Sequence, residues 1–402
     1  MKTKSVDLKK LLRTTDQIHS LEELRVKLAT GKPLRIKFGA DVTAPFLHIG
    51  HAVNLWLMRY LQECGHTVVF LIGDFTTRIG DPTGKTETRK EIPQKEIEKN
   101  AKDFIKQVGE VLLTKPAVFE VRRNSEWFGK MRLDEFIKLL AQTTHAKLIQ
   151  RDMFQKRIAD NKEIHIHEMI YPILQGYDSY MLKSDLTIVG TDQLFNELMG
   201  RFYQERFGQA PQVVVTTQIT PGLDGVEKQS KSLGNYIALS DTPQDKFGKI
   251  MSLPDTLIVP YLRVYTEIPL EEVSGIENGM TSGTLHPMEV KKRLGKALVE
   301  RYHGGSEALK AEKEFSNIFQ KKETPQEVKV ITFNPQNAPT IIDVFTRAKI
   351  VSSKSEARRL IEQGGIELND VKISDNPPTA NIRDGTLLKV GKKRFFRLKK
   401  EK

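Results

Sequence analysis

Two histidines, His48 and His51, lie three residues apart in the stretch FLHIGHAVNL of a chain that holds only nine histidines. A segment with strand character, PLRIKFGAD, precedes them, and apolar residues at helical spacing follow them. Histidines in such a place could ligate a metal ion, bind a phosphate or pack inside a core. A core role is disfavoured, because a polar–apolar–glycine–polar sequence beside a loop does not form an apolar face.

A metal site at this pair would need more ligands than the sequence places nearby. Zinc takes three or four protein ligands, and the other histidine cluster, HIHE at 165–168, lacks the HExxH spacing. The single cysteine, Cys64, excludes a cysteine cluster and an internal disulfide. A phosphate fits better, because the N–H groups and dipole of a helix N-terminus favour anions and Gly50 allows close approach. We therefore expect a phosphate here and no metal held by the protein.

A second pair of cations, Lys228 and Lys231, lies about 180 residues downstream in KQSKS. A lysine pair with this spacing is, on its own, usually a solvated surface feature. Here it follows a predicted strand and a loop that contains glycine and proline. Two lysines on such a loop can clamp a leaving pyrophosphate, whose negative charge grows as the α-phosphate is attacked.

The two motifs together resemble a known family. GADVTAPFLHIGH resembles the HIGH signature of the class I aminoacyl-tRNA synthetases, and KQSKS resembles their second signature, KMSKS. The resemblance implies activation of an amino acid by ATP with Mg²⁺, and it assigns catalytic roles to Thr43, His48, His51, Lys228 and Lys231. The ATP-binding residues that it implies are Gly39, Asp41, His48, Gly50, His51, Gly190, Asp192, Lys228, Ser230 and Lys231.

A polar stripe in YPILQGYD identifies the amino acid. Tyr171, Gln175 and Asp178 follow at i, i+4 and i+7, so they share one face of a predicted helix, and a polar face needs a ligand or a partner. The stripe resembles the tyrosine pocket of the tyrosyl-tRNA synthetases. The resemblance implies that Asp178 accepts the phenolic hydroxyl and that Tyr171 and Gln175, together with Asp81, hold the α-ammonium group. The full set that it implies for tyrosine is Thr76, Asp81, Tyr171, Gln175, Asp178 and Gln193.

Five positions depart from the family pattern: Lys37, Phe38, Val42, Asn54 and Gln229. Lys37 stands where many bacterial relatives carry a tyrosine that contacts the substrate hydroxyl, and we leave it out of the expected site residues. Gln229 replaces the methionine of KMSKS. We expect this exchange to matter little, because the two lysines carry the charge.

Buried strands alternate with helices in the first half of the chain. Strands are predicted at 33–41, 67–75, 185–190 and 212–218, with a helix from 48 to about 65. The pattern predicts an α/β fold with a doubly wound, parallel, Rossmann-like sheet, followed by an α-helical domain and a small α+β module. The expected domains are a catalytic domain at 1–225 with a helical insertion at about 87–170, a signature loop and connector at 226–242, a helical domain for the tRNA anticodon stem at 243–322, a linker at 323–338 and the final module at 339–402.

Positive charge gathers in the final module. Residues 338–402 hold 15 Lys and Arg against 8 Asp and Glu, which is seven of the twelve net positive charges of the chain. Such a basic module is typical of nucleic-acid binders. The stretch SSKSEARRLIEQGGIELND resembles an S4-type RNA-binding domain, so the resemblance implies tRNA(Tyr) as a partner, together with a homodimer. The expected tRNA-binding residues are Lys354, Arg358, Arg359, Lys392, Lys393 and Arg394.

Several classes of protein are disfavoured by the composition. No apolar run approaches the roughly 18–20 residues of a membrane span, and the N-terminus lacks the apolar core of a secretory signal. We therefore expect a cytoplasmic enzyme that makes tyrosyl-adenylate from L-tyrosine and ATP and then charges tRNA. A tryptophanyl-tRNA synthetase is the nearest alternative, and a non-catalytic RNA-binding paralogue is an alternative from another class.

Overall fold

The chain forms two compact units in the computed structural model, Met1–Leu309 and Lys310–Lys402. The residues that the structure describes are 3–43, 47–81, 92–230, 233–320, 328–351, 353–369, 371–391 and 394–401. Among these residues, no helix is both long and apolar enough to cross a lipid bilayer.

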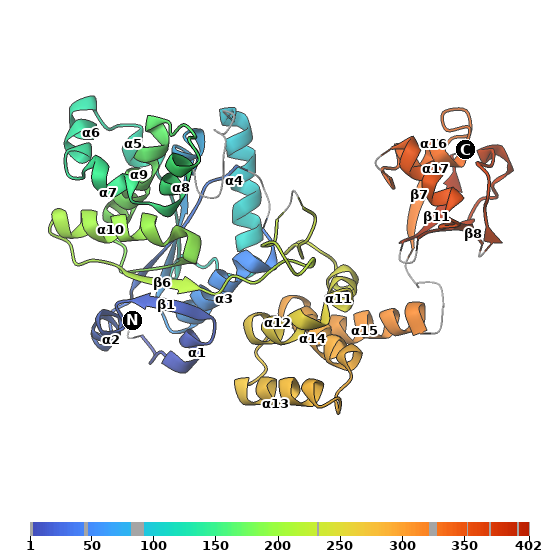
Figure 1. Cartoon of the computed structure of the whole chain (residues 1–402), viewed down its shortest axis with the longest axis horizontal. Coiled ribbons are helices and arrows are strands. Elements are labelled where there is room, and N and C mark those ends of the chain that lie inside the picture. Colours follow the sequence, from blue (N-terminus) through green and yellow to red (C-terminus); the bar gives the residue numbers. More distant parts are fainter. Residues whose placement is uncertain are drawn as a thin grey trace. The chain divides into compact units, whose positions relative to one another are not determined.

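The first unit is built around a six-stranded sheet with the strand order β1-β6-β5-β2-β3-β4 (Figure 1). All neighbouring pairs are parallel except β1 and β6. The strands are β1 (Thr15–His19), β2 (Arg35–Ala40), β3 (Thr67–Ile72), β4 (Phe119–Arg123), β5 (Leu186–Gly190) and β6 (Val213–Thr217). The predicted doubly wound α/β class is confirmed, and the antiparallel edge strand β1 adds a feature that the sequence did not predict.

Helices cover both faces of the sheet, and its central strand β3 is accordingly apolar on both faces. On one face, α3 (Ile49–Glu63) and α4 (Gln94–Val108) share a core with Ile36, Phe38 and Phe70. On the other face, α5 (Ser125–Phe128) and α9 (Ile166–Leu182) pack on Val69 and Leu71. Helix α10 (Leu194–Arg206) lies along α9, and α1 (Leu8–Leu12) and α2 (Leu21–Ala29) flank β1 in sequence.

The segment 87–170 is not wholly helical, which corrects our prediction. Its residues 87–91 lie outside the described residues. Of the rest, β4 is an edge strand of the sheet, and Ile97 and Ala101 of α4 belong to the main core. The charges in FEVRR hid the strand, since an edge strand is apolar on fewer positions than a central one. Only the part after β4 is an insertion of helices, namely α5, α6 (Leu133–Leu140), α7 (His145–Ile149) and α8 (Asp152–Ala159).

A group of helices follows β6. It comprises α11 (Pro243–Met251), α12 (Ile258–Tyr265), α13 (Leu270–Thr281) and α14 (Pro287–His303), and α15 (Gly305–Gln320) comes next in the chain. Helices α11 and α14 approach closely at Gly295, where an added Cβ would lie 3.0 Å from the Phe247 ring. Trp56 of α3 donates a hydrogen bond to the Tyr302 hydroxyl of α14 over 3.1 Å. These helices therefore pack on the α3 side of the sheet.

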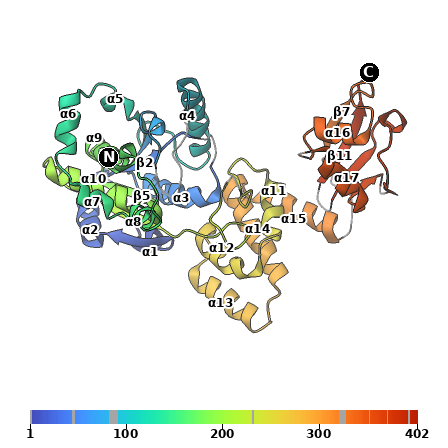
Figure 2. The ribbon, with the colours of Figure 1, turned by 45° about the horizontal axis from the view of Figure 1, so that its top comes forward.

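The second unit has its own sheet and core (Figure 2). Helices α16 (Ile341–Arg347) and α17 (Lys354–Glu362) pack on five strands in the order β7-β11-β10-β8-β9. The strands are β7 (Lys329–Phe333), β8 (Ile366–Leu368), β9 (Val371–Lys372), β10 (Leu387–Val390) and β11 (Arg394–Lys400). The pairs β8–β9 and β10–β11 are antiparallel. The linker prediction at 323–338 is wrong for 329–333, because β7 pairs in parallel with β11.

Candidate active site

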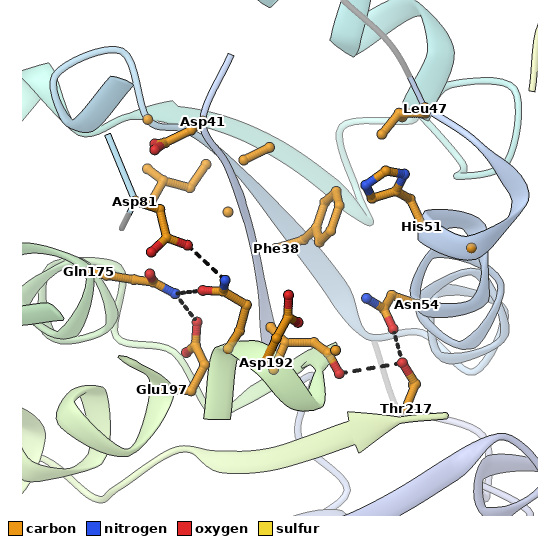
Figure 3. A pocket seen from close by; sticks show the side chains of 18 of the residues that line it. Phe38, Asp41, Leu47, His51, Asn54, Asp81, Gln175, Asp192, Glu197 and Thr217 are labelled. Atoms are coloured by element: carbon orange, nitrogen blue, oxygen red, sulfur yellow. Dashed lines mark hydrogen bonds between the residues drawn. The ribbon is translucent and has the colours of Figure 1, made fainter. Parts of the chain in front are cut away.

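A cavity of about 380 Å³ opens at the carboxyl ends of β2, β3 and β5 (Figure 3). This is the edge at which doubly wound sheets bind ligands, and the volume suits a small molecule. The cavity brings together nearly all the predicted ATP and tyrosine residues from distant parts of the chain. Those that line it are Gly39, Asp41, Thr43, His48, Gly50, His51, Thr76, Asp81, Tyr171, Gln175, Asp178, Gly190, Asp192, Gln193 and Lys228. Ser230 does not line it, and Lys231 lies outside the described residues.

The two histidines lie where α3 begins. His48 is the N-cap residue, and its backbone N–H donates to Nδ1 of His51 over 3.4 Å. The proton of the neutral His51 ring is therefore on Nε2. Gly50 is required between them, because a Cβ there would lie 2.9 Å from Nδ1 of His48.

Both rings are neutral at pH 7. Desolvation lowers the pKa of His48 to about 2, with further lowering by His51 and Lys228. The His51 ring faces the cavity, yet the protein around it desolvates it and lowers its pKa to about 4. Neutral imidazoles can still donate hydrogen bonds to phosphate oxygens. The helix N-terminus and nearby cations supply the positive potential.

The segment that carries the second signature is fastened to the start of α3. The N–H of Ile49 donates to the carbonyl of Ile237 over 3.0 Å, and that of Leu239 donates to Leu47 over 3.1 Å. Lys228, mostly exposed, lies 3.5 Å from Asp192 across the mouth of the cavity. The segment and the histidines are thus held beside each other, as a phosphate site needs.

Gln229 anchors this segment, contrary to our expectation that it matters little. Its side chain is buried, and its Nε2 donates to the Tyr265 hydroxyl of α12 over 2.9 Å. The Tyr265 hydroxyl also bonds Thr220, which follows β6. Gln229 therefore connects the signature segment to the helical part of the unit.

Asp178 lies at the closed end of the cavity and is 3% exposed. Its Oδ1 accepts from Nε1 of Trp127 over 2.9 Å, and its Oδ2 accepts from Nδ2 of Asn124 over 3.3 Å. Burial raises the pKa of Asp178 to about 8, although Lys37 and the two hydrogen bonds act in the opposite direction. A buried carboxylate with two fixed donors has remaining acceptor capacity for a hydroxyl group.

The side of the cavity next to Asp178 holds a chain of amides. Nε2 of Gln193 donates to Asp81 over 2.8 Å, and Nε2 of Gln175 donates to Glu197 over 2.9 Å (Figure 3). Nδ2 of Asn196 donates to Gln175 over 2.8 Å. Carboxylate and amide oxygens gathered in this way suit an ammonium group.

Asp41 closes the same side. It accepts from the Tyr171 hydroxyl over 3.0 Å and from Thr76 Oγ1 over 2.8 Å. Burial, followed by the charge of Asp41, raises the pKa of Tyr171 well above its usual value, so Tyr171 remains a donor. Gly73 leaves room for this group, because its Cβ would lie 2.5 Å from both Asp41 and Thr76.

Sequence reasoning missed four residues of the site: Lys37, Glu197, Asn124 and Trp127. Lys37 carried a signal, because a lysine in the middle of the apolar strand PLRIKFGA needs a buried partner. Asn124 and Trp127 gave none, since they follow the strand β4 that we took for part of a helical insertion.

The predicted tRNA-binding residues that the structure describes, Lys354, Arg358, Arg359 and Arg394, lie at the surface of the second unit. Arg358 and Arg359 are exposed on α17, and Lys354 at its start lies 2.8 Å from Asp343. Arg394 donates to the carbonyl of Ile350. Lys392 and Lys393 lie outside the described residues. No group of three or more His, Cys, Asp or Glu that could hold a metal ion occurs among the residues that the structure describes.

Known proteins match the chain along nearly its whole length. Residues 29–320 match the family described as tRNA synthetases class I (W and Y), and residues 320–398 match the tyrosine--tRNA ligase SYY-like C-terminal domain. The tyrosine--tRNA ligase of Moorella thermoacetica is 46% identical over 94% of this chain and 90% of its own length, and that of Thermotoga maritima is 42% identical over 98% of each. The chain therefore belongs to the class I tRNA synthetases for tryptophan and tyrosine, which confirms the family that its signatures indicated.

Solved structures share the fold at lower identity. A C-terminally truncated mitochondrial tyrosyl-tRNA synthetase of Aspergillus nidulans has a TM-score of 0.62 at 21% identity and covers 77% of this chain and 92% of its own. The tyrosyl-tRNA synthetase of Archaeoglobus fulgidus, complexed with L-tyrosine, has a TM-score of 0.59 at 22% identity and covers 76% of this chain and 100% of its own. A tryptophanyl-tRNA synthetase of Plasmodium falciparum has a TM-score of 0.56 at 20% identity, covering 74% and 81%. The likeness establishes the common fold.

Proposed function

We propose that the protein activates L-tyrosine with ATP, releasing pyrophosphate, and transfers the tyrosyl group of the adenylate to the 3′ end of tRNA(Tyr), releasing AMP. The observation that carries the choice of tyrosine is Asp178, a buried carboxylate at the closed end of the cavity. A phenolic hydroxyl can donate to it. An indole N–H could also donate, but residues 320–398 match the tyrosine-type C-terminal domain.

In the first step, the tyrosine carboxylate attacks the α-phosphate of ATP, so the protein needs no nucleophile of its own. Asp178 holds the phenol, and Asp81, Tyr171 and Gln175 hold the ammonium group, which fixes the carboxylate in place. His51 Nε2–H, the N-terminus of α3 and Lys228 stabilise the charge that grows on the departing phosphates. Magnesium enters with ATP as part of that substrate.

In the second step, a ribose hydroxyl at the 3′ end of the tRNA attacks the carbonyl of the adenylate. The net charge of the second unit and its exposed arginines Arg358 and Arg359 support a role in holding the tRNA phosphates. Lys354, Lys392, Lys393 and Arg394 belong to the same proposal.

We also propose that the protein works as a homodimer in the cytoplasm, where tRNA and ATP are found. Large apolar side chains support a protein contact on the helical insertion and at the start of α9. Leu133, Ile137 and Ile166 are 75%, 55% and 72% exposed. Apolar surface of this kind marks contact sites.

The test is ATP–pyrophosphate exchange with each of the twenty amino acids, without tRNA. Exchange with tyrosine alone is the expected result. Exchange with tryptophan instead would keep the ATP site and reject the tyrosine pocket. Absence of exchange from folded protein that binds RNA would indicate a non-catalytic relative.

A further inference from the structure

A lysine and a glutamate form an ion pair beneath the tyrosine pocket. Lys37 of β2 and Glu197 of α10 are 1% and 2% exposed, and Nζ of Lys37 lies 2.8 Å from Oε2 of Glu197. Both side chains also line the cavity. Removing two charges from water is costly, and a well-packed apolar pair in the same place is often at least as stable. Stability alone therefore does not explain the pair.

Glu197 is the junction of the polar groups at one end of the pocket. Besides Lys37, its carboxylate accepts from Nε2 of Gln175 and Nε2 of Gln212, each over 2.9 Å. Gln175 in turn lies 3.4 Å from Oε1 of Gln193, whose amide donates to Asp81. The carboxylate of Glu197 thus orients the amide of Gln175, which is proposed to hold the ammonium group of tyrosine.

Lys37 reaches the other end of the pocket. Its Nζ donates to Oγ of Ser179 over 2.7 Å, and Ser179 follows Asp178 directly on α9. The charge of Lys37 also acts on Asp178 against the effect of burial. One side chain therefore touches the residue next to the phenol acceptor and the junction of the amides.

The helices leave space for this pair at two glycines. A Cβ on Gly200 of α10 would lie 2.5 Å from Oγ of Ser179 and 2.7 Å from Nε2 of Gln212. A Cβ on Gly176 of α9 would lie 2.9 Å from the carbonyl oxygen of Met199. The close approach of α9 and α10 is what brings Ser179, Glu197 and Gln212 within reach of β2.

We propose that Lys37 and Glu197 act as one positioning unit, which holds Asp178 and the amide of Gln175 in register with the two ends of tyrosine and so sets its selectivity over phenylalanine. The proposal rests on the proposed function. It adds two residues that act through others, because neither is assigned a contact with the reacting atoms.

The test compares single variants with a charge-neutral double variant. Lys37→Met leaves a buried carboxylate alone and Glu197→Gln leaves a buried ammonium alone, so each is expected to lower Tm. The double variant Lys37→Met/Glu197→Gln removes both charges, so its Tm is expected to return most of the way to that of the wild type. In ATP–pyrophosphate exchange, the double variant should nevertheless raise the KM for tyrosine and lower the tyrosine-to-phenylalanine ratio of kcat/KM, each about tenfold, with the KM for ATP within about twofold.

Two further variants keep the test decisive. Glu197→Asp retains the charge but shortens the side chain, so it should fold and still raise the KM for tyrosine. Lys246→Met removes another fully buried lysine, whose Nζ donates to the carbonyls of Leu239 and Asp241 and which does not line the cavity. This control should lower Tm and leave the tyrosine-to-phenylalanine ratio unchanged.

The outcomes separate the two proposals. If the double variant recovers both the Tm and the KM for tyrosine of the wild type, the pair has only a structural role. An unchanged KM for tyrosine in Glu197→Asp would lead to the same conclusion. A wild-type protein without tyrosine-dependent exchange would instead overturn the proposed function.

Discussion

The end of the cavity at the start of α3 and the end around Asp178 differ in how their polar groups are partnered. At the end proposed to bind the phosphates, Lys228 is 60% exposed and lies 3.5 Å from Asp192. At the end proposed to bind tyrosine, Asp178 is buried and accepts hydrogen bonds from Trp127 and Asn124. Fixed, desolvated groups discriminate between ligands, because an unmatched group there cannot turn to water. Solvated cations can instead follow charge as it moves during a reaction.

The tyrosine end should be the more sensitive to change. Asp178→Ala leaves the donors of Trp127 and Asn124 without their acceptor and removes the acceptor for the phenol. We expect kcat/KM for tyrosine to fall by about 10²–10³-fold, since a phenol hydroxyl buried without its acceptor costs about 1–3 kcal/mol, and more where the acceptor is charged. ATP–pyrophosphate exchange with tyrosine and with phenylalanine measures this fall. An unchanged ratio of kcat/KM between the two amino acids would reject Asp178 as the phenol acceptor.

The phosphate end should affect rate more than tyrosine binding. His51→Ala removes one donor to the departing phosphates, and we expect kcat to fall by about 10²-fold, as for loss of one transition-state donor. The Kd for tyrosine, measured by equilibrium dialysis, should change by less than about twofold. A large loss of tyrosine affinity would mean that the two ends are not separate.

The two ends should also differ in pH dependence. Asp178, with a pKa of about 8, gains the ionised form that accepts a hydroxyl as pH rises, so the tyrosine-to-phenylalanine ratio should increase about tenfold from pH 7 to pH 9. The ratio cancels the titration of the α-amino group, which both substrates share. His48 and His51 titrate far below this range and should add no step between pH 6 and 9.

The contribution of Asp178 to the free energy of unfolding should change with pH in the opposite direction, and fall as pH rises. The pKa of Asp178 is higher in the folded protein than its usual 3.8, so the folded state favours the neutral acid. Its contribution to the free energy of unfolding is complete below about pH 4 and is lost as pH rises through about 8. Urea unfolding of the wild type and of Asp178→Asn, whose side chain does not ionise, measures this contribution. Parallel pH dependence in the two proteins would contradict it.

The smallest effect is expected outside the cavity. Arg358→Ala with Arg359→Ala should raise the KM for tRNA about three- to tenfold and make its dependence on salt less steep, because phosphate contacts release counterions. Exchange without tRNA should be unaffected. Arg25→Ala, an exposed arginine of α2, is the matched control. Equal effects of the two changes would remove the second unit from the tRNA site.

Local patterns in the sequence predicted the residues that come from single elements. His48 and His51 lie within one helix start, and Tyr171, Gln175 and Asp178 share one face of α9, so spacing alone placed each group. The edge strands β1 and β4 were missed because TDQIH and FEVRR carry charges toward solvent. β7 was missed because prolines on both sides of it indicated a linker.

The sequence by itself determined the family, the central parallel sheet, and the residues of both signatures and of the tyrosine stripe. Only the tertiary structure decided which groups surround Asp178 and where the charge of Lys37 is balanced. Lys37 comes from β2, Glu197 from α10, Trp127 from α5 and Asn124 from the position between β4 and α5, and each meets its partner only where the sheet and α9 bring them together. Periodicity reports which face of an element is polar, but it carries no information on which other element will face it. The close approach of α9 and α10 at Gly176 and Gly200 decides which elements face each other, and this approach is a property of packing.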